Sequence, residues 1–229
     1  MFKGLVDYSN PASLGSKMRR RRFERIERLV RKVLAGQPRC RIIDIGGTVS
    51  YWRLMDERLL DSCDVTITNL EVPKGHDPWT GVPSSGQFSF HIGDGRRLEF
   101  SDQSFDIAHS NSVIEHVGTF ADMQMLVAES RRLARSFYIQ TPYFWFPVEP
   151  HFGLPLIHYL PMPLRSKLLI RFGDGFGRRF NGVVEAMSLL ESINLIDRAQ
   201  ARALLLDGER LEAERVFGLT KSLVLLRSG

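Results

Sequence analysis

The distribution of apolar and polar positions along the chain predicts strands that are separated by helix-length connections. An apolar run with β-branched residues ends at Asp44 and is followed by two glycines, as expected for a buried parallel strand. Further strands are expected at 64–71, 87–94, 104–110 and 137–141, and helices at 51–60, 120–134 and 183–206. This order indicates an α/β fold with a Rossmann-like, doubly wound, mostly parallel sheet and helices on both faces.

Two later segments add to this plan. Residues 211–227 contain two strand-like runs about a turn at Gly218, which suits an antiparallel C-terminal hairpin. Residues 143–180 are rich in aromatic residues, prolines and glycines, and long irregular segments usually carry function. We therefore expect an inserted lid over the ligand end of the sheet, within a domain that spans residues 36–229.

A basic amphipathic helix is expected within residues 1–35. Apolar residues recur there at helical spacing from Phe23 to Leu34. The basic residues of this segment are Lys17, Arg19, Arg20, Arg21, Arg22, Arg25, Arg28, Arg31 and Lys32. Such a face suits three roles, namely the solvated side of a packed helix, contact with an anionic membrane, or contact with nucleic acid.

The composition is that of a globular protein with a sizeable core, because 43% of the 229 residues are hydrophobic and 25% are charged. No apolar stretch approaches the roughly 18 residues of a spanning helix, and the first ten residues lack a secretory pattern. Cys40 and Cys63 show neither a disulfide nor a metal-ligand pattern. We expect no metal and a cytoplasmic protein, with the basic helix suited to peripheral contact at the inner face of the membrane.

The turn at Gly46 and Gly47 has the features of a nucleotide-type site. Glycines allow positive φ and remove the Cβ atoms that would meet a bound molecule. The dinucleotide fingerprint requires further glycines, but Thr48, Val49 and Ser50 follow here, so NAD is not the expected ligand. A plain tight turn between a strand and a helix is the alternative.

Longer motifs carry a resemblance to a known family. The turn IDIGGT and the run GDGRRLEFSDQSFDIAHSNSVIEHV occur in order within about residues 41–141. Together they resemble the class I S-adenosylmethionine-dependent methyltransferases of the type 11, small-molecule group. The resemblance implies a Rossmann-like enzyme with S-adenosylmethionine as its cofactor. The chain departs from the family at Val49 or Ser50, where a further glycine is usual.

The resemblance and the chemistry of the cofactor together suggest the residues that bind it. Asp44 is expected at the cofactor's amino group, directly or through water, although its carboxylate could also hold its own loop. The ribose hydroxyls need an acceptor, for which Glu71 is favoured over Asn69. The resemblance places Asp94 at the adenine amino group. The remaining expected contacts are Gly46, Gly47, Thr48, Gly95, Arg96, Ser110 and Asn111.

Methyl transfer is an in-line displacement, and a hydroxyl acceptor benefits from a base. His116, Glu149 and His151 are expected near the ligand end of the sheet, and a histidine poised near neutral pH suits this task. Each histidine could equally form only backbone hydrogen bonds. The aromatic residues at 143–146 suit either a stacking platform for a substrate ring or the core of the lid.

The sequence thus predicts a methyltransferase that acts on a hydroxyl of a small-molecule, glycan or lipid-linked acceptor. The segment TPYFWFPVEPHF resembles methyltransferases linked to bacterial cell-surface glycan or glycolipid modification. Two alternatives stay open: an RNA methyltransferase, and a non-catalytic interaction protein that retains the fold. Nucleic acid is not the expected partner, because Ser110-Asn111-Ser112-Val113 lacks the Pro-Pro-aromatic turn that clamps a flipped base. The oligomeric state has no signal in the sequence.

Overall fold

The computed structural model describes residues 14–71 and 86–229, and most of the predicted loop at 73–86 lies outside them. Its main sheet has seven strands in the order β3-β2-β1-β4-β5-β9-β8. The first five strands of that order are parallel, and β9 pairs antiparallel with both β5 and β8. The strands are β1 (Cys40–Ile45), β2 (Cys63–Asn69), β3 (Gln87–Ile92), β4 (Phe105–Asn111), β5 (Ala134–Pro142), β8 (Arg210–Val216) and β9 (Leu219–Arg227). The predicted Rossmann-like sheet with a C-terminal hairpin is confirmed.

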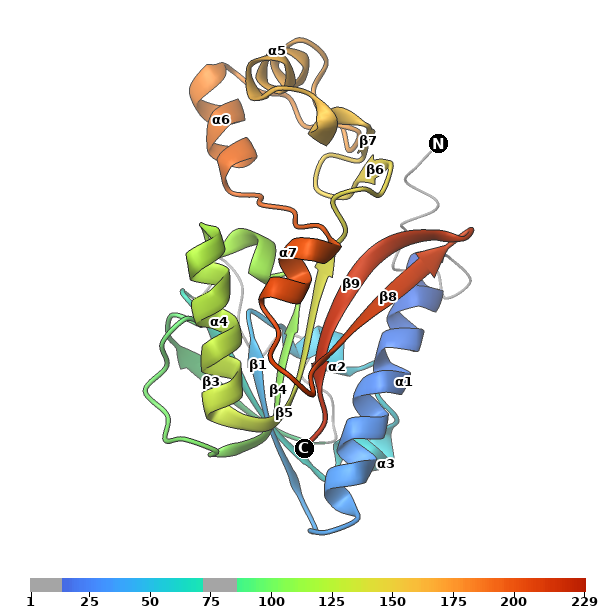
Figure 1. Ribbon diagram of the computed structural model, residues 1–229, viewed down its shortest axis with the longest axis vertical. Helices are drawn as coiled ribbons and strands as arrows, with labels where there is room; N and C mark the ends of the chain where they lie inside the picture. Colours follow the sequence, from blue (N-terminus) through green and yellow to red (C-terminus); the bar gives the residue numbers. More distant parts are fainter. Residues whose placement is uncertain (1–13, 72–85) are drawn as a thin grey trace.

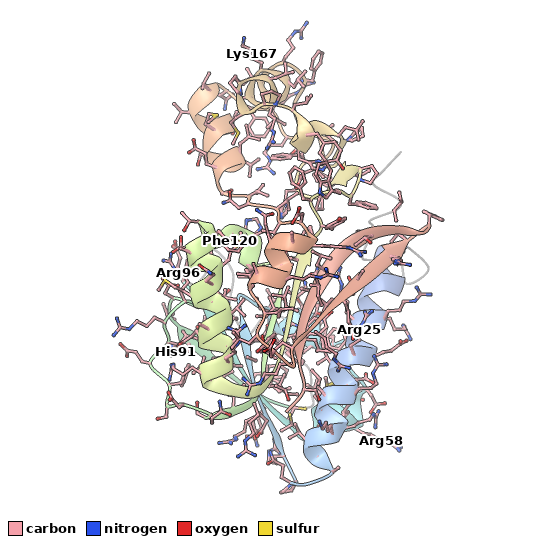
Figure 2. All side chains as sticks on the ribbon, in the orientation of Figure 1. Arg25, Arg58, His91, Arg96, Phe120 and Lys167 are labelled. Atoms are coloured by element: carbon pink, nitrogen blue, oxygen red, sulfur yellow. The ribbon has the colours of Figure 1, made fainter. Side chains whose placement is uncertain are left out.

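Helices cover both faces of the sheet (Figure 1). Side chains alternate along a strand, so Ile42 belongs to the core on one face and Ile43 to the core on the other. The first face packs against α1 (Leu14–Leu34), α2 (Val49–Trp52) and α3 (Glu57–Leu60). The second packs against the short 3-10 helix η1 (Ile114–His116), α4 (Phe120–Leu133) and α7 (Arg198–Ala203).

The basic helix α1 is part of this packing. Phe23 and Ile26 are buried in the same core as β1, β2 and β4. The Arg22 Nε atom lies 2.8 Å from Glu214 Oε2, and Arg25 Nε lies 3.1 Å from Glu212 Oε2, so two arginines are paired with the C-terminal hairpin. Arg20, Arg21, Arg28, Arg31 and Lys32 are exposed. Within the described ranges, no helix combines the length and apolar character that a membrane span requires.

Two predicted helices are interrupted. The helix expected at 51–60 is two short helices, because Asp56 begins a new one by accepting a hydrogen bond from the Leu59 N–H. The helix expected at 183–206 is also two helices. The first is α6 (Val183–Glu191), and the second is α7, which begins at a capping box formed by Asp197 and Gln200. Between them, Ile196 pairs with Tyr143 at the end of the sheet.

The predicted lid is a separate structural unit that follows β5 directly (Figure 1). It contains β6 (Val148–Glu149), β7 (Leu154–Pro155), the 3-10 helix η2 (Ile157–Tyr159), α5 (Met162–Phe172) and α6. Its core consists of Phe152, Ile157, Leu169, Phe180, Ala186 and Leu190. Because Ala186 and Leu190 of α6 share this core, the lid continues beyond the expected end at residue 180.

Candidate active site

The glycine turn after β1 admits no side chain at either glycine. Gly46 has a φ of +74°, and a Cβ there would lie 2.5 Å from Val113 Cγ2. A Cβ on Gly47 would lie 1.7 Å from Asp44 Oδ2. The Gly46 N–H donates to the Thr68 carbonyl over 2.7 Å, which ties the turn to the end of β2. The turn therefore depends on both glycines, and the Asp44 carboxylate packs directly against Gly47.

A pocket of about 450 Å³ opens at the carboxyl ends of β1, β2, β3 and β4. Its size lies within the range of small-molecule sites. Seven predicted residues line it, namely Gly46, Asn69, Glu71, Asp94, Gly95, Arg96 and His116. Gly47 and Thr48 belong to the same turn but do not line the pocket, and Thr48 is exposed. The structure thus brings together residues from four separate segments of the chain.

Asp94 and Asn69 are held in place inside this pocket. Arg96 donates to both oxygens of Asp94, with Nη2 at 2.6 Å from Oδ2 and Nε at 3.0 Å from Oδ1. These bonds hold the pKa of the Asp94 carboxyl below its usual range, so it stays an acceptor. The Asn69 amide donates to the Gly47 carbonyl over 3.1 Å. Glu71 is exposed and lines the pocket, so its carboxylate is accessible to a ligand.

Asp44 is placed differently from the prediction. The residue is 0% exposed and does not line the pocket. The parallel register of β1 and β4 sets it beside His109, whose Nδ1 lies 2.6 Å from Asp44 Oδ1. Trp52 Nε1 donates to Asp44 Oδ2 over 2.8 Å. Both carboxylate oxygens are therefore hydrogen-bonded in the interior, and the expected contact with a cofactor amino group, directly or through water, stays a prediction.

Ser110 and Asn111 also lie outside the pocket lining. Ser110 is 0% exposed, and its hydroxyl donates to the Ile45 carbonyl over 3.2 Å. Asn111 Oδ1 accepts from Arg22 Nη1 of α1 over 3.2 Å. Both side chains thus tie the carboxyl end of β4 to neighbouring elements, Ser110 to β1 and Asn111 to α1. Sequence reasoning missed the role of Arg22 because its partners are 89 or more residues away.

The three predicted catalytic side chains come together between the sheet and the lid. His151 Nδ1 lies 2.7 Å from Glu149 Oε1, and the Phe152 N–H donates to Glu149 Oε2 over 2.7 Å. The rings of His116 and His151 meet edge to face, with 4.8 Å between centroids. Burial lowers the pKa of His151, but the hydrogen bond to Glu149 and nearby negative charge outweigh it and leave the pKa raised.

Glu115 completes this cluster, although it was not among the predicted site residues. It is 0% exposed, and its Oε2 accepts from Thr141 Oγ1 over 3.0 Å. Its Oε1 lies 3.8 Å from His151 Nε2. Burial raises the pKa of Glu115 to about 7. The Glu-His pair in the sequence motif was the available signal for this residue.

A second pocket of about 280 Å³ lies between the lid and the sheet domain. Its lining includes Phe144, Glu149, His158 and Arg165 of the lid and Thr119 of the sheet domain. Phe144 thus lines a pocket, while Trp145 is 57% exposed. His116 belongs to the first pocket and Glu149 to the second, and His151 contacts both residues. The cluster therefore links the two pockets.

The comparisons with known proteins agree with this geometry. Residues 44–136 match the model of the methyltransferase domain family. The match runs from the end of β1 to the start of β5, and it supports S-adenosylmethionine as the cofactor. No protein of curated function matches the chain.

Solved structures share the fold of the methyltransferase domain. A Rhodobacter sphaeroides protein described as a zinc-dependent alcohol dehydrogenase is 13% identical, with a TM-score of 0.58 over 88% of this chain and 89% of that chain. The magnesium protoporphyrin IX methyltransferase of Synechocystis, with bound S-adenosylmethionine, is 11% identical, with a TM-score of 0.51 over 91% and 79%. An N-methyltransferase of Bradyrhizobium japonicum, in complex with S-adenosyl-L-homocysteine, is 12% identical, with a TM-score of 0.51 over 89% and 85%.

The residues of the first pocket fit S-adenosylmethionine chemically. Asp94 is an ionised acceptor that could receive the adenine N–H donors, and Glu71 and Asn69 offer acceptors for ribose hydroxyls. The glycine turn forms the pocket floor at Gly46, where the backbone is accessible. His116 of the histidine cluster lines the same pocket.

Proposed function

We propose that this protein transfers a methyl group from S-adenosylmethionine to a hydroxyl of a small-molecule, glycan or lipid-linked acceptor. The observation that supports this proposal best is the link between the two pockets. The first has the acceptors that an adenosyl cofactor needs, and the second lies under the lid. The Glu115, His116 and His151 side chains lie between them.

In this proposal the cofactor, when bound, supplies the methyl group as a sulfonium. Asp94, Glu71 and Asn69 would hold the adenosine in the first pocket, which His116 of the cluster also lines. The lid pocket holds the acceptor and excludes water from it. One of the two histidines, either His151 oriented by Glu149 or His116, takes the proton of the acceptor hydroxyl. The hydroxyl oxygen then bonds to the methyl carbon as the bond between that carbon and the cofactor's sulfur breaks.

Equilibrium binding of S-adenosyl-L-homocysteine tests the cofactor part of the proposal. Asp94→Asn and Glu71→Gln should each weaken its binding by at least about 10-fold, because hydrogen bonds to charged groups contribute about 1.5–3 kcal/mol. Glu99→Gln is the matched control, since Glu99 is an exposed carboxylate outside the pocket. Equal affinity in all three variants would reject this pocket as the cofactor site.

The acceptor class requires a transfer assay. Labelled S-adenosylmethionine is incubated with protein and with separate lipid, glycan, small-molecule and nucleic-acid fractions of a bacterial extract. Label in a base-stable ether within one of the first three fractions supports the proposal. Label in nucleic acid instead would support the RNA alternative, and cofactor binding without any transfer would support the non-catalytic alternative.

Contact with an anionic membrane remains part of this proposal. Arg20, Arg21 and Arg28 are exposed on α1, as are Arg31 and Lys32. Replacing these five residues with glutamine leaves the packed face and the Arg22 and Arg25 pairs untouched. Sedimentation with vesicles that contain phosphatidylglycerol should then fall clearly relative to the parent protein. Equal sedimentation of both proteins would exclude this face as a membrane contact.

A further inference from the structure

Three metal-ligating side chains converge at the link between the two pockets. Glu115, His116 and His151 each offer one ligand atom, and these atoms all lie within 4.8 Å of one another. Glu115 and His116 come from η1 after β4, whereas His151 comes from the lid. The folded chain therefore assembles a group that is scattered in the sequence.

Each of the three side chains is anchored through its other polar atom. His151 Nδ1 is hydrogen-bonded to Glu149 Oε1, and His116 Nδ1 donates to the Ser192 carbonyl over 2.8 Å. Glu115 Oε2 accepts from Thr141 Oγ1. This arrangement leaves His151 Nε2, His116 Nε2 and Glu115 Oε1 for a further partner. Histidines that bind a metal characteristically donate their other ring N–H to a carboxylate or a backbone carbonyl.

Glu115 Oε1 is the most informative of these atoms. It is buried, and within the described part of the chain it has no hydrogen-bond partner. A buried carboxylate oxygen without a partner is costly, so a cation beside it is expected. The adjacent His151 Nε2, at 3.8 Å, is too far for a hydrogen bond but close enough to share one bound ion after a small movement.

We propose that Glu115 Oε1, His116 Nε2 and His151 Nε2 bind one divalent transition-metal ion. Two imidazoles and one carboxylate form a donor set that suits zinc, iron, cobalt or nickel better than magnesium or calcium. Ligand atoms about 2.1 Å from one ion lie roughly 3.0–3.4 Å apart, so the present separations must shorten by about 1 Å. His116 is exposed, which leaves its ring room to move.

The position of this ion gives it a role in the proposed reaction. His116 lines the cofactor pocket, and Glu149, which orients His151, lines the lid pocket. Three protein ligands leave a coordination position open, and an acceptor oxygen bound there would be fixed beside the cofactor by the ion, in place of the direct contact with the two histidines. This role rests on the proposed function, whereas the binding of the ion does not.

The test measures metal binding without turnover. Protein freed of metal by chelation is titrated with Co²⁺, followed by visible absorption, and with Zn²⁺, followed by calorimetry. We expect one ion per chain with a Kd below about 10 μM. His151→Ala, His116→Ala and Glu115→Gln should each weaken binding by at least about 10-fold, and Glu149→Gln by about 10-fold or more. His91→Ala is the matched control, because His91 lies on β3 outside the cluster.

Two further measurements keep the result decisive. Melting temperatures identify any variant that does not fold. If Glu115→Gln does not fold, the His116→Ala variant still tests the metal site, because His116 is exposed. Affinity for S-adenosyl-L-homocysteine in the metal-free protein separates loss of the ion from failure of the cofactor proposal. A Kd above about 100 μM, or equal affinity in the parent and the His151→Ala variant, would overturn the metal site. Such a result would leave a protonated His151 between the two carboxylates as the cation of the cluster.

Discussion

Among the described residues, two carboxylate–imidazole pairs of similar length lie in different surroundings. Asp44 and His109 lie 2.6 Å apart in the sheet, with side-chain exposures of 0% and 1%. Glu149 and His151 lie 2.7 Å apart in the lid, and the histidine is 20% exposed. The same chemical pair therefore occurs once inside the protein core and once at the edge of a pocket.

The second ring nitrogen distinguishes the two pairs. His109 stacks on Tyr138, with 5.6 Å between centroids and 7° between planes, and its Nε2 is buried without a partner among the described residues. His151 Nε2 instead approaches Glu115 at the link between two pockets. When the Nε2 atom of the histidine is buried in the core, a carboxylate–histidine pair serves to hold the packing around it. When Nε2 lies beside a pocket, the pair is available for chemistry.

The largest expected effect is loss of stability on removal of Asp44. Asp44→Ala leaves the Trp52 N–H and the His109 ring buried without their acceptor, so the free energy of unfolding should fall by about 3–5 kcal/mol. Urea unfolding measures this change. Asp64→Ala is the control, because Asp64 pairs with Arg39 at 2.6 Å but both side chains are over one third exposed, so its loss should be about 0–1 kcal/mol. A similar loss of unfolding free energy in both variants would contradict a structural role for the buried Asp44–His109 pair.

The second effect concerns the turn that covers Asp44. Gly47→Ala introduces a Cβ 1.7 Å from Asp44 Oδ2, so the turn or the carboxylate must move, at a cost of about 1–3 kcal/mol. Gly182→Ala is the control, since a Cβ there meets nothing within 4 Å. Thermal unfolding of the two variants is compared with the parent. If Gly47→Ala were as stable as Gly182→Ala, the expected steric clash between a Cβ at position 47 and Asp44 would be contradicted.

The smallest effect on stability is expected at the second pair. His151→Ala should change the free energy of unfolding by less than about 1 kcal/mol, because the side chain is partly exposed. Its affinity for S-adenosyl-L-homocysteine should stay within about 2-fold, while kcat for methyl transfer falls by at least about 10-fold through loss of acceptor positioning. Denaturation, binding and single-turnover rates separate these quantities. A destabilised variant with an unchanged rate would reverse the assignment of the two pairs.

The sequence by itself determined the order of the strands, the glycine turn, the hairpin at Gly218 and the presence of an inserted segment after the fifth strand. These features depend on local signals, because hydrophobic period, glycine and proline act within a few residues. The motif also placed Asn69, Glu71 and Asp94 at one edge, since the carboxyl ends of parallel strands meet there.

Only the tertiary structure decided which of the candidate side chains face a ligand. The register of β1 on β4 sets His109 beside Asp44 and makes this carboxylate part of a buried pair. The return of the lid after β5 brings His151 to Glu115, 36 residues earlier in the chain. Hydrogen-bond partners of this kind come from distant segments, and their choice depends on the packing of the whole chain.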